Sequence, residues 1–297
     1  MSERNGKSGA RMDRTTVGWV NGCIGMVIFS GSLPATRAAV MGFEPFFLTA
    51  ARAAVAGLLA LALLVLLRQR RPDRRDLPPL AVVAGGVVIG FPLLSALALR
   101  HVSAAHSLVF IGLLPLVTAV CGAWRGGERP GPAFWAFSVL GGVLVAAYAA
   151  GQGEASLPGD LLMLAAVLVC GLGYAEGGRL SRRLGGWQVI SWVLALSLPV
   201  TLPLAVWAMP RSFAAVDAAA WAGLAYVSLG SMLLGFVFWY RGLALGGIAA
   251  VGQLQLLQPF LGLVLAALLL DEAVSPAMLG AAIGVVACVA GARKFAA

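Results

Sequence analysis

The sequence predicts an all-α integral membrane protein with ten transmembrane helices, arranged as two inverted five-helix repeats. Three observations predict this fold: the apolar composition, the placement of the basic residues, and an internal repeat. Of the 297 residues, 60% are hydrophobic and 11% are charged, whereas soluble proteins have roughly 45–50% apolar and roughly 25% charged residues. A chain with so few charges needs an apolar solvent on its outside, and a bilayer supplies one.

Ten segments of the chain are apolar enough to cross the bilayer as helices, which takes about 20 mostly apolar residues each. The connections between them are short, so they leave no room for a soluble domain. We expect the spans at residues 17–36, 44–67, 79–99, 103–124, 132–150, 160–178, 187–208, 218–240, 248–270 and 276–292.

The basic residues test this number of spans, because cytoplasmic loops carry an excess of Lys and Arg. If the N-terminus lies in the cytosol, seventeen of the 21 Lys and Arg residues fall on the cytoplasmic side. Arg37, Arg100 and Arg211 fall outside, and Arg52 lies within a span. One missed helix would reverse every later loop, so this ratio favours ten spans with both termini cytoplasmic. The net charge of +9 thus reflects membrane topology, and we expect no nucleic-acid partner.

The second half of the chain repeats the first at an offset of 144 residues. Pro115 precedes Glu128 by 13 residues, and Pro259 precedes Glu272 by the same distance. Because each repeat holds five spans, an odd number, the second copy must insert in the opposite direction. The predicted organisation is a cytosolic tail (1–16), a first repeat (17–150), an outer connecting loop (151–159), a second repeat (160–292) and a cytosolic C-terminal tail (293–297).

Several spans carry two glycines four residues apart. This spacing places both on one helix face, where they allow close contact with another helix. The pattern does not indicate which helix is the partner. The pairs are Gly18/Gly22, Gly86/Gly90, Gly242/Gly246 and Gly280/Gly284.

Inverted repeats are typical of secondary transporters, in which two similar halves open a central cavity to each side in turn. The sequence has no P-loop, so nothing indicates built-in use of ATP. It has no HExxH motif, and no paired aspartates or Ser/His pair in the spans; we therefore expect no enzyme and assign no catalytic residue. The four cysteines show no CxxC or Cys/His spacing, so we expect neither a metal site nor a cofactor. The alternative is a membrane-embedded sensor or accessory subunit, or an enzyme without a recognisable motif.

The residues around both prolines resemble the EamA-type members of the drug/metabolite transporter superfamily. The resemblance rests on the turns GGERPGP and LDEAVSP, and on Glu44-Pro45 followed by Arg52. It implies a multi-pass protein of the bacterial inner membrane that exports or exchanges a small metabolite such as an amino acid. It also implies a central cavity lined mainly by spans three, four, eight and nine, with help from one and six. The expected partners are a small-molecule substrate and membrane lipid, for a monomer or a homodimer.

Span nine contains the best candidates for contact with a substrate. Pro115 and Pro259 lie near the middle of spans four and nine, where each removes a backbone hydrogen bond and kinks the helix. The freed carbonyls need a wet cavity or protein partners. Gln255 and Gln258 share a face of span nine, whereas the equivalent positions of span four are apolar. These amides either contact the substrate, or form hydrogen bonds with the backbone groups that Pro259 leaves unpaired or with neighbouring helices.

Four further residues have two open interpretations each. Arg52 either faces the cavity and attracts a substrate carboxylate, or snorkels to the interface. Trp239 either lines the cavity or packs within the bundle. His106 either serves proton coupling or is an interfacial histidine. Glu176 either pairs with Arg179, three residues on, or faces the cavity and takes part in proton coupling.

Overall fold

The structure is a computed structural model that describes residues 13–102, 107, 110–150, 156–258, 260, 261 and 276–295. All regular secondary structure in these residues is helical. In the first half the elements are α1 (Arg14–Ser30), α2 (Ser32–Gly42), α3 (Pro45–Leu66), η1 (Arg74–Asp76), α4 (Leu77–Val83), η2 (Ala84–Gly90), α5 (Phe91–Ala98), α7 (Leu114–Gly126) and α8 (Pro132–Ala150). In the second half they are α9 (Leu157–Leu184), α10 (Gly186–Trp207), α11 (Ala218–Ala225), η3 (Tyr226–Gly235), α12 (Phe236–Gly246), α13 (Ile248–Gly252), η4 (Gln253–Leu257) and α15 (Pro276–Lys294).

Six continuous helical stretches in the described part of the chain are long and apolar enough to cross a membrane. Predicted spans four and nine fall partly outside the described residues, at 103–106, 108, 109, 259 and 262–275. The six stretches are Arg14–Gly42, Pro45–Leu66, Arg74–Ala98, Leu157–Leu184, Gly186–Trp207 and Ala218–Gly246.

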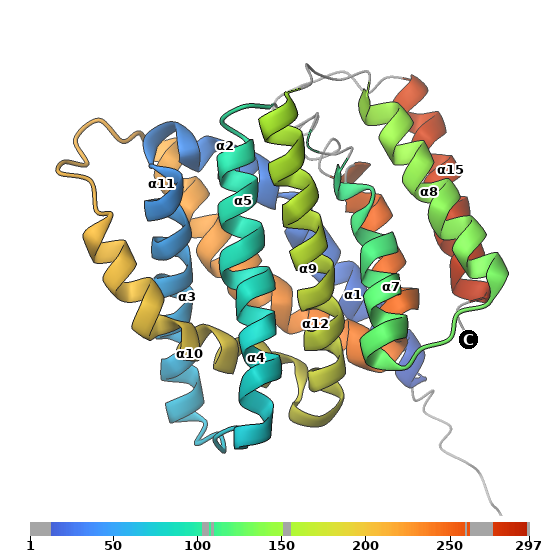
Figure 1. Ribbon diagram of the computed structural model, residues 1–297, viewed down its shortest axis with the longest axis horizontal. Coiled ribbons are helices and arrows are strands. Elements are labelled where there is room, and N and C mark those ends of the chain that lie inside the picture. Colours follow the sequence, from blue (N-terminus) through green and yellow to red (C-terminus); the bar gives the residue numbers. More distant parts are fainter. Residues whose placement is uncertain are drawn as a thin grey trace, which may run out of the picture.

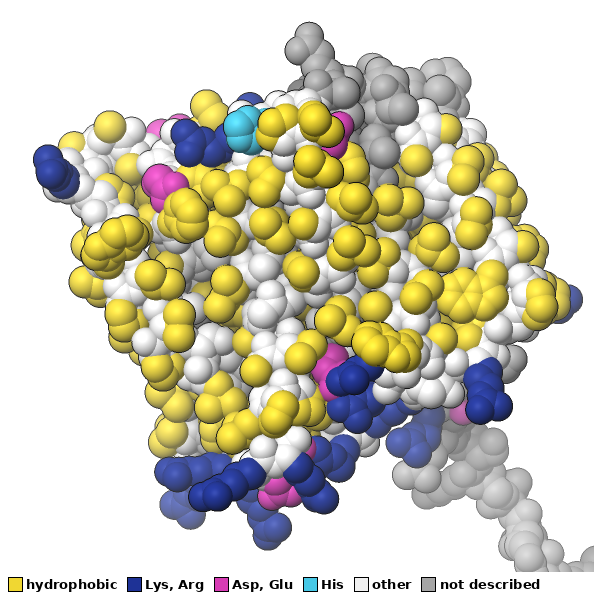
Figure 2. Space-filling model, in the orientation of Figure 1, with side chains coloured by type: hydrophobic (Ala, Val, Ile, Leu, Met, Phe, Trp, Pro, Cys, Tyr) yellow, Lys and Arg dark blue, Asp and Glu magenta, His cyan; other side chains and the backbone are white. Residues whose placement is uncertain are grey.

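The outer surface of the bundle is apolar. Leu58 and Leu59 of α3 and Val200 and Leu204 of α10 are between 44% and 52% exposed. Figure 2 shows hydrophobic side chains across the middle of one face and Lys and Arg side chains gathered along its lower edge. A surface of this kind needs lipid as its solvent, so the protein is an all-helical membrane protein. We call this edge the arginine-rich end; the α3–α4 connection and the ends of α7 and α9 lie there (Figure 1), and they carry Arg68, Arg70, Arg71, Arg74, Arg75, Arg125, Arg129, Arg179, Arg182 and Arg183.

Local sequence explains where the helices begin and end. Glu44 caps α3 by accepting hydrogen bonds from two backbone N–H groups of its first turn, at 2.8 and 3.2 Å, and Pro45 takes the first helical position. α9 extends to Leu184, six residues beyond the predicted end of span six, and α12 also runs past residue 240. Both helices stop at glycines with positive φ, Gly185 at 96° and Gly247 at 92°. The arginines of α9 therefore lie on a helical extension of the span.

The helices pair across the two halves of the chain (Figure 1). α3 packs against α10, and α8 lies beside α15 at one side of the bundle. α1 packs against α12, as α5 does against α9. These pairs agree with a two-fold relation between the halves, which would exchange the first span with the sixth and the third with the eighth, and so would turn the contact of α1 with α12 into that of α9 with α5. η2 and η3 are both π-helical, and they overlap when the chain is shifted by 144 residues.

Paired glycines bring α1 and α12 together. A Cβ atom on Gly18 would lie 2.4 Å from the backbone nitrogen of Gly246, and one on Gly242 would lie 2.7 Å from that of Gly22. No real Cβ atom approaches so closely, so the glycines let the two backbones touch. A Cβ atom on Gly280, in contrast, would meet nothing within 4 Å among the described residues.

Candidate functional site

A narrow cavity lies at the centre of the bundle, between the two halves. Its volume open to water is about 30 Å³, which accommodates about one or two water molecules. The helices must therefore separate before a metabolite can enter. The lining residues come from both halves: Phe29, Ser32, Leu33, Thr36, Arg52, Val87, Phe91, Pro92, Ser95 and Leu114 from the first, and Cys170, Tyr174, Ser231, Phe236 and Gln258 from the second.

Arg52 supplies the charge of this cavity. Its side chain comes from α3, lines the cavity and is only 6% exposed. Nε has no hydrogen-bond partner, and no carboxylate in the described part of the chain forms an ion pair with Arg52. A charged group within the bilayer costs roughly 2.5–3.5 kcal/mol or more. The guanidinium is therefore a candidate site for an anionic group, and a carboxylate would match its geometry.

Polar groups from both halves surround the same cavity. The Gln258 amide donates to the carbonyl oxygen of Phe29 at 3.2 Å, and the Ser32 hydroxyl donates to the Ser231 hydroxyl at 2.8 Å. The Ser95 hydroxyl donates to the carbonyl oxygen three residues earlier, at 3.3 Å. Each hydroxyl oxygen keeps acceptor capacity. The cavity therefore offers hydrogen-bond acceptors near a fixed positive charge.

Aromatic side chains close the cavity on the side of the arginine-rich end. The Phe29 ring lies 5.0 Å from that of Phe236, 6.0 Å from that of Trp239 and 6.3 Å from that of Tyr174, measured between centroids. α12 begins at the cavity with Phe236 and runs towards the arginine-rich end, so Trp239 lies one turn below the cavity. These rings separate the cavity from the arginine-rich end.

Two residues predicted to line the cavity lie behind its wall. Gln255 is fully buried, and its amide nitrogen donates to Thr118 Oγ1 at 3.3 Å and to the Gly252 carbonyl at 3.1 Å. Trp239 is also fully buried. Of the two span-nine amides singled out from the sequence, Gln258 faces the cavity and Gln255 connects α7 to its own helix.

The other predictions in spans four and nine have different outcomes. Pro115 occupies the second position of α7, directly after a turn at residues 112 and 113. The helix is therefore interrupted before the proline, where a missing N–H costs nothing, and is not kinked at it. Its neighbour Leu114 lines the cavity. Pro259 and His106 lie outside the described residues.

Glu176 makes the ion pair that its spacing from Arg179 predicts. The carboxylate is fully buried and also accepts a hydrogen bond from Arg125 Nε at 3.1 Å. It does not line the cavity in the described part of the chain. These contacts tie α9 to α7 at the arginine-rich end, and they favour the ion-pair interpretation over proton coupling.

Glu128 makes a second connection at this end, between the two halves. Its carboxylate accepts hydrogen bonds from the backbone N–H groups of Ile248 at 2.8 Å and Ala249 at 2.7 Å. These are the first two residues of α13, where free N–H groups favour a negative charge. Glu128 also pairs with Arg182 of α9. One side chain thus joins α7 to α9 and α13.

The sequence reasoning did not single out the hydroxyl residues of the cavity. Ser32 and Thr36 lie one turn apart on α2 and both line the cavity, as does Ser231. Such residues are common in membrane helices, where their hydroxyls bond to the preceding turn. The sequence contained one signal for these residues, because the four-residue spacing of Ser32 and Thr36 places both on one helix face.

Comparison with known proteins identifies the family. The EamA-like transporter family matches residues 16–148 and again residues 157–293. The "Uncharacterized transporter YdeK" of Bacillus subtilis (strain 168) is 64% identical over 96% of this chain and 100% of its own length. The "Probable terminal-alkyne amino-acid exporter" of Streptantibioticus cattleyicolor is 28% identical over 88% of both chains.

A solved structure supports the fold. A protein of known crystal structure, 23% identical, superimposes with a TM-score of 0.75 and covers 95% of this chain and 98% of its own. The two sequence matches to one family together span nearly the whole protein. The chain therefore belongs to the EamA-like transporter family, a family of transporters and not of enzymes.

Proposed function

We propose that this protein is a secondary transporter that exports a small metabolite with a carboxylate, such as an amino acid. Arg52 is the observation that carries the proposal, because it is a buried guanidinium in a cavity between the two halves and has no anionic partner among the described residues. Hydroxyl acceptors surround it, which suits an amino group, and Leu33, Val87 and Leu114 offer an apolar wall. The relative named as an exporter of a terminal-alkyne amino acid supports the same class of substrate.

The proposed mechanism is alternating access between two inverted five-helix repeats in a bacterial plasma membrane, with both termini cytoplasmic. The cross-half helix pairs and the shared position of the two π-helices support the symmetry. The guanidinium of Arg293 lies 4.7 Å from the ring centroid of Trp19, so the start of α1 and the end of α15 lie at one end of the bundle. The excess of arginine at that end favours the cytoplasm.

Transport in proteoliposomes tests the role of Arg52. We expect exchange of neutral amino acids, with leucine as the first probe, and little exchange of leucinamide, which lacks the carboxylate. Loss of a charged hydrogen bond in Arg52→Gln weakens substrate binding roughly 10- to 150-fold. Arg52→Lys restores part of it. Arg211→Gln, an exposed charge outside the bundle core, is the matched control and leaves exchange unchanged.

The ratio of amino-acid transport to amino-acid amide transport distinguishes a loss of carboxylate recognition from a loss of folded protein. A folded Arg52→Gln variant that still prefers every amino acid over its amide would refute the assignment. Measurements in cells add the direction: overexpression of an exporter raises resistance to toxic amino-acid analogues, and unchanged resistance contradicts export.

Proton coupling remains a prediction for His106 and Glu176. If Glu176 carries a coupling proton, Glu176→Gln makes uptake into vesicles insensitive to an imposed pH gradient. If its role is the ion pair with Arg125 and Arg179, the variant loses thermal stability and keeps the response of the parent protein. Collapse of the pH gradient with no change in wild-type transport removes coupling altogether.

A further inference from the structure

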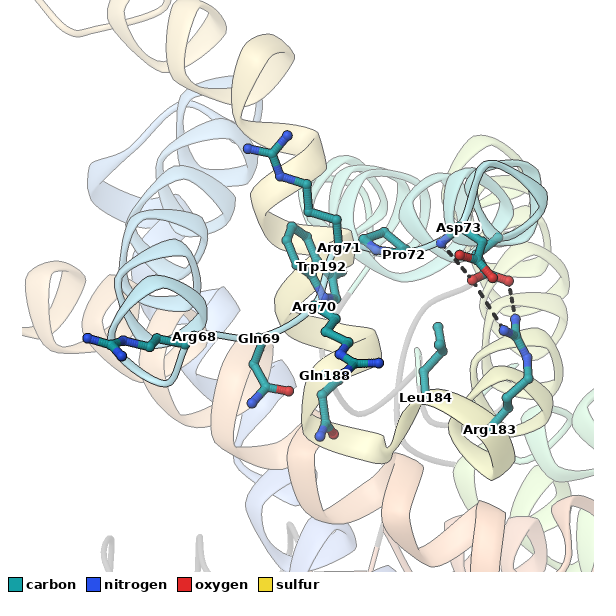
Figure 3. Close-up of a pocket in the computed structure, with 11 residues that line it drawn as sticks. Arg68, Gln69, Arg70, Arg71, Pro72, Asp73, Arg183, Leu184, Gln188 and Trp192 are labelled. Atoms are coloured by element: carbon teal, nitrogen blue, oxygen red, sulfur yellow. Dashed lines mark hydrogen bonds and ion pairs between the residues drawn. The ribbon is translucent and has the colours of Figure 1, made fainter.

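A second pocket lies at the arginine-rich end, apart from the central cavity. It has a volume of about 310 Å³, at the small end of the range for ligand sites. One wall is the connection between α3 and η1, and the other is the turn between α9 and the start of α10 (Figure 3). The lining residues that matter here are Arg68, Arg70, Arg71, Arg183, Gln188 and Trp192.

The pocket carries an excess of positive charge. Arg68, Arg70 and Arg71 form no ion pair within the described part of the chain, whereas both nearby carboxylates are engaged. Asp76 is buried and pairs with Arg183, and Asp73 pairs with the arginine two residues on, at 3.1 Å. Three arginines thus remain without a counter-charge around one hollow.

The backbone holds these arginines in place. Arg68 has a φ of 48°, a left-handed conformation that is uncommon for a residue other than glycine. This residue ends α3, and the N–H of Gln69 returns to the carbonyl of Leu64 at 2.9 Å. The chain then crosses from α3 towards α4, and Figure 3 shows Arg70 and Arg71 on this crossing, opposite Gln188 and Trp192.

The far wall has the features of a membrane interface. Trp192 belongs to a residue type that favours the headgroup region of a bilayer. The amide oxygen of Gln188 is buried without a hydrogen-bond partner among the described residues. Directly beside the pocket, Leu66 and Leu67 are 76% and 55% exposed, which marks the edge of the apolar surface.

An apolar groove continues from this pocket along α10. It has a volume of about 410 Å³ and runs between α10 on one side and α4 and η2 on the other. Leu196 and Val200 line it, and Gln188 and Trp192 precede them at intervals of four residues. Residues spaced by four share one face of a helix. The basic pocket and the apolar groove therefore lie along one face of α10.

We propose that this surface binds one anionic phospholipid, with its phosphate in the basic pocket and an acyl chain in the groove. Arg70 and Arg71 pair with the phosphate oxygens, as basic pockets between membrane helices do with anionic headgroups. Phosphatidylglycerol carries a net negative charge and phosphatidylcholine does not, so the two lipids distinguish a charge-selective site. The Asp76–Arg183 ion pair in the wall of the pocket joins the two halves, so a lipid bound here contacts both.

Lipid titration of the purified full-length protein tests the site. Phosphatidylglycerol, phosphatidylcholine, glycerol 3-phosphate and inorganic phosphate are each titrated, with retained lipid measured by native mass spectrometry and binding by the shift in melting temperature. We expect phosphatidylglycerol to bind more tightly than phosphatidylcholine. Arg70→Gln with Arg71→Gln weakens phosphatidylglycerol binding by about 25-fold, at about fivefold for each arginine. If the double variant does not purify, each single variant is tested against the fivefold value.

Two controls match these variants. Arg74→Gln with Arg211→Gln removes the same charge outside the pocket, and we expect phosphatidylglycerol to bind as it does to the parent protein. Gly85→Phe fills the groove at a position where a Cβ atom would meet nothing within 4 Å. It weakens phosphatidylglycerol binding and leaves glycerol 3-phosphate unaffected.

Several results overturn the proposal. Equal affinity for phosphatidylglycerol and phosphatidylcholine excludes a charge-selective site. An equal loss of phosphatidylglycerol affinity in the Arg70/Arg71 and the Arg74/Arg211 double variants excludes this pocket as the binding site. The pocket binds a free anion instead of a lipid if two results occur together. Inorganic phosphate then displaces phosphatidylglycerol equally from the parent protein and from Gly85→Phe, and Gly85→Phe shows no loss of lipid affinity.

Discussion

Glu128→Gln tests whether the connection between α7 and α13 closes the arginine-rich end. The carboxylate is 16% exposed and accepts two backbone hydrogen bonds from the start of α13. Hydrogen bonds to a charged group contribute about 1.5–3 kcal/mol each, and a neutral one about 1 kcal/mol. Since the glutamine keeps one acceptor oxygen, and so one neutral hydrogen bond, the variant loses about 2–5 kcal/mol. The pair with Arg182 is more exposed and adds at most about 1 kcal/mol.

This loss acts on the balance between conformations. If the contact exists only while the arginine-rich end is closed, the ratio of closed to open protein falls by roughly 30- to 5,000-fold. Cys170 is a natural reporter, because it lines the cavity and is only 1% exposed. Its labelling by a small thiosulfonate reagent is measured in a background in which Cys23, Cys121 and Cys288 are replaced by serine. We expect labelling at least tenfold faster in Glu128→Gln.

Glu44→Gln is the matched control for this experiment. Glu44 also accepts two N–H groups at a helix start, but on the opposite side of the bundle from the arginine-rich end. This variant leaves the labelling of Cys170 from the arginine-rich end unchanged. Equal labelling rates in Glu128→Gln and the parent protein, with both folded, would refute the role of Glu128 in closure.

The remaining predictions concern packing, orientation and substrate contact. Gly242→Ala forces α1 and α12 apart and destabilises the protein by about 1–3 kcal/mol, whereas Gly280→Ala is neutral, as thermal unfolding in detergent shows; equal melting temperatures contradict the backbone contact. A membrane-impermeant maleimide added to whole cells labels Ser212→Cys and not Arg74→Cys, and the opposite pattern reverses the proposed orientation. Gln258→Ala weakens amino-acid exchange in proteoliposomes without loss of folded protein, and full exchange removes this amide from the site.

Much of the architecture followed from local sequence. A helical membrane protein of the transporter class was predicted from features that can be read along the chain without a structure. These features are the apolar segments, the arginine-rich connections and the repeat at an offset of 144 residues. The glycine spacing predicted that α1 and α12 make close contacts. It could not identify their partner, because any small face can accept any other.

The tertiary structure decided which polar side chains meet. Gln255 and Gln258 are one turn apart, yet only Gln258 lines the cavity, because the irregular η4 segment and the packing against α7 set the direction of each side chain. Spans that are apolar on every side contain no periodic signal for the face that turns inwards.

Contacts between residues far apart in the chain also could not be predicted from the sequence. The Glu128 carboxylate meets N–H groups 120 and 121 residues away, and Ser32 meets Ser231 across 199 residues. The sequence by itself determined the solvent of this protein and the order of its helices, since burial in lipid depends on composition. Only the folded bundle decided that Arg52 Nε is buried without a hydrogen-bond partner among the residues that the structure describes, because packing brings together the residues that could pair with it from distant helices.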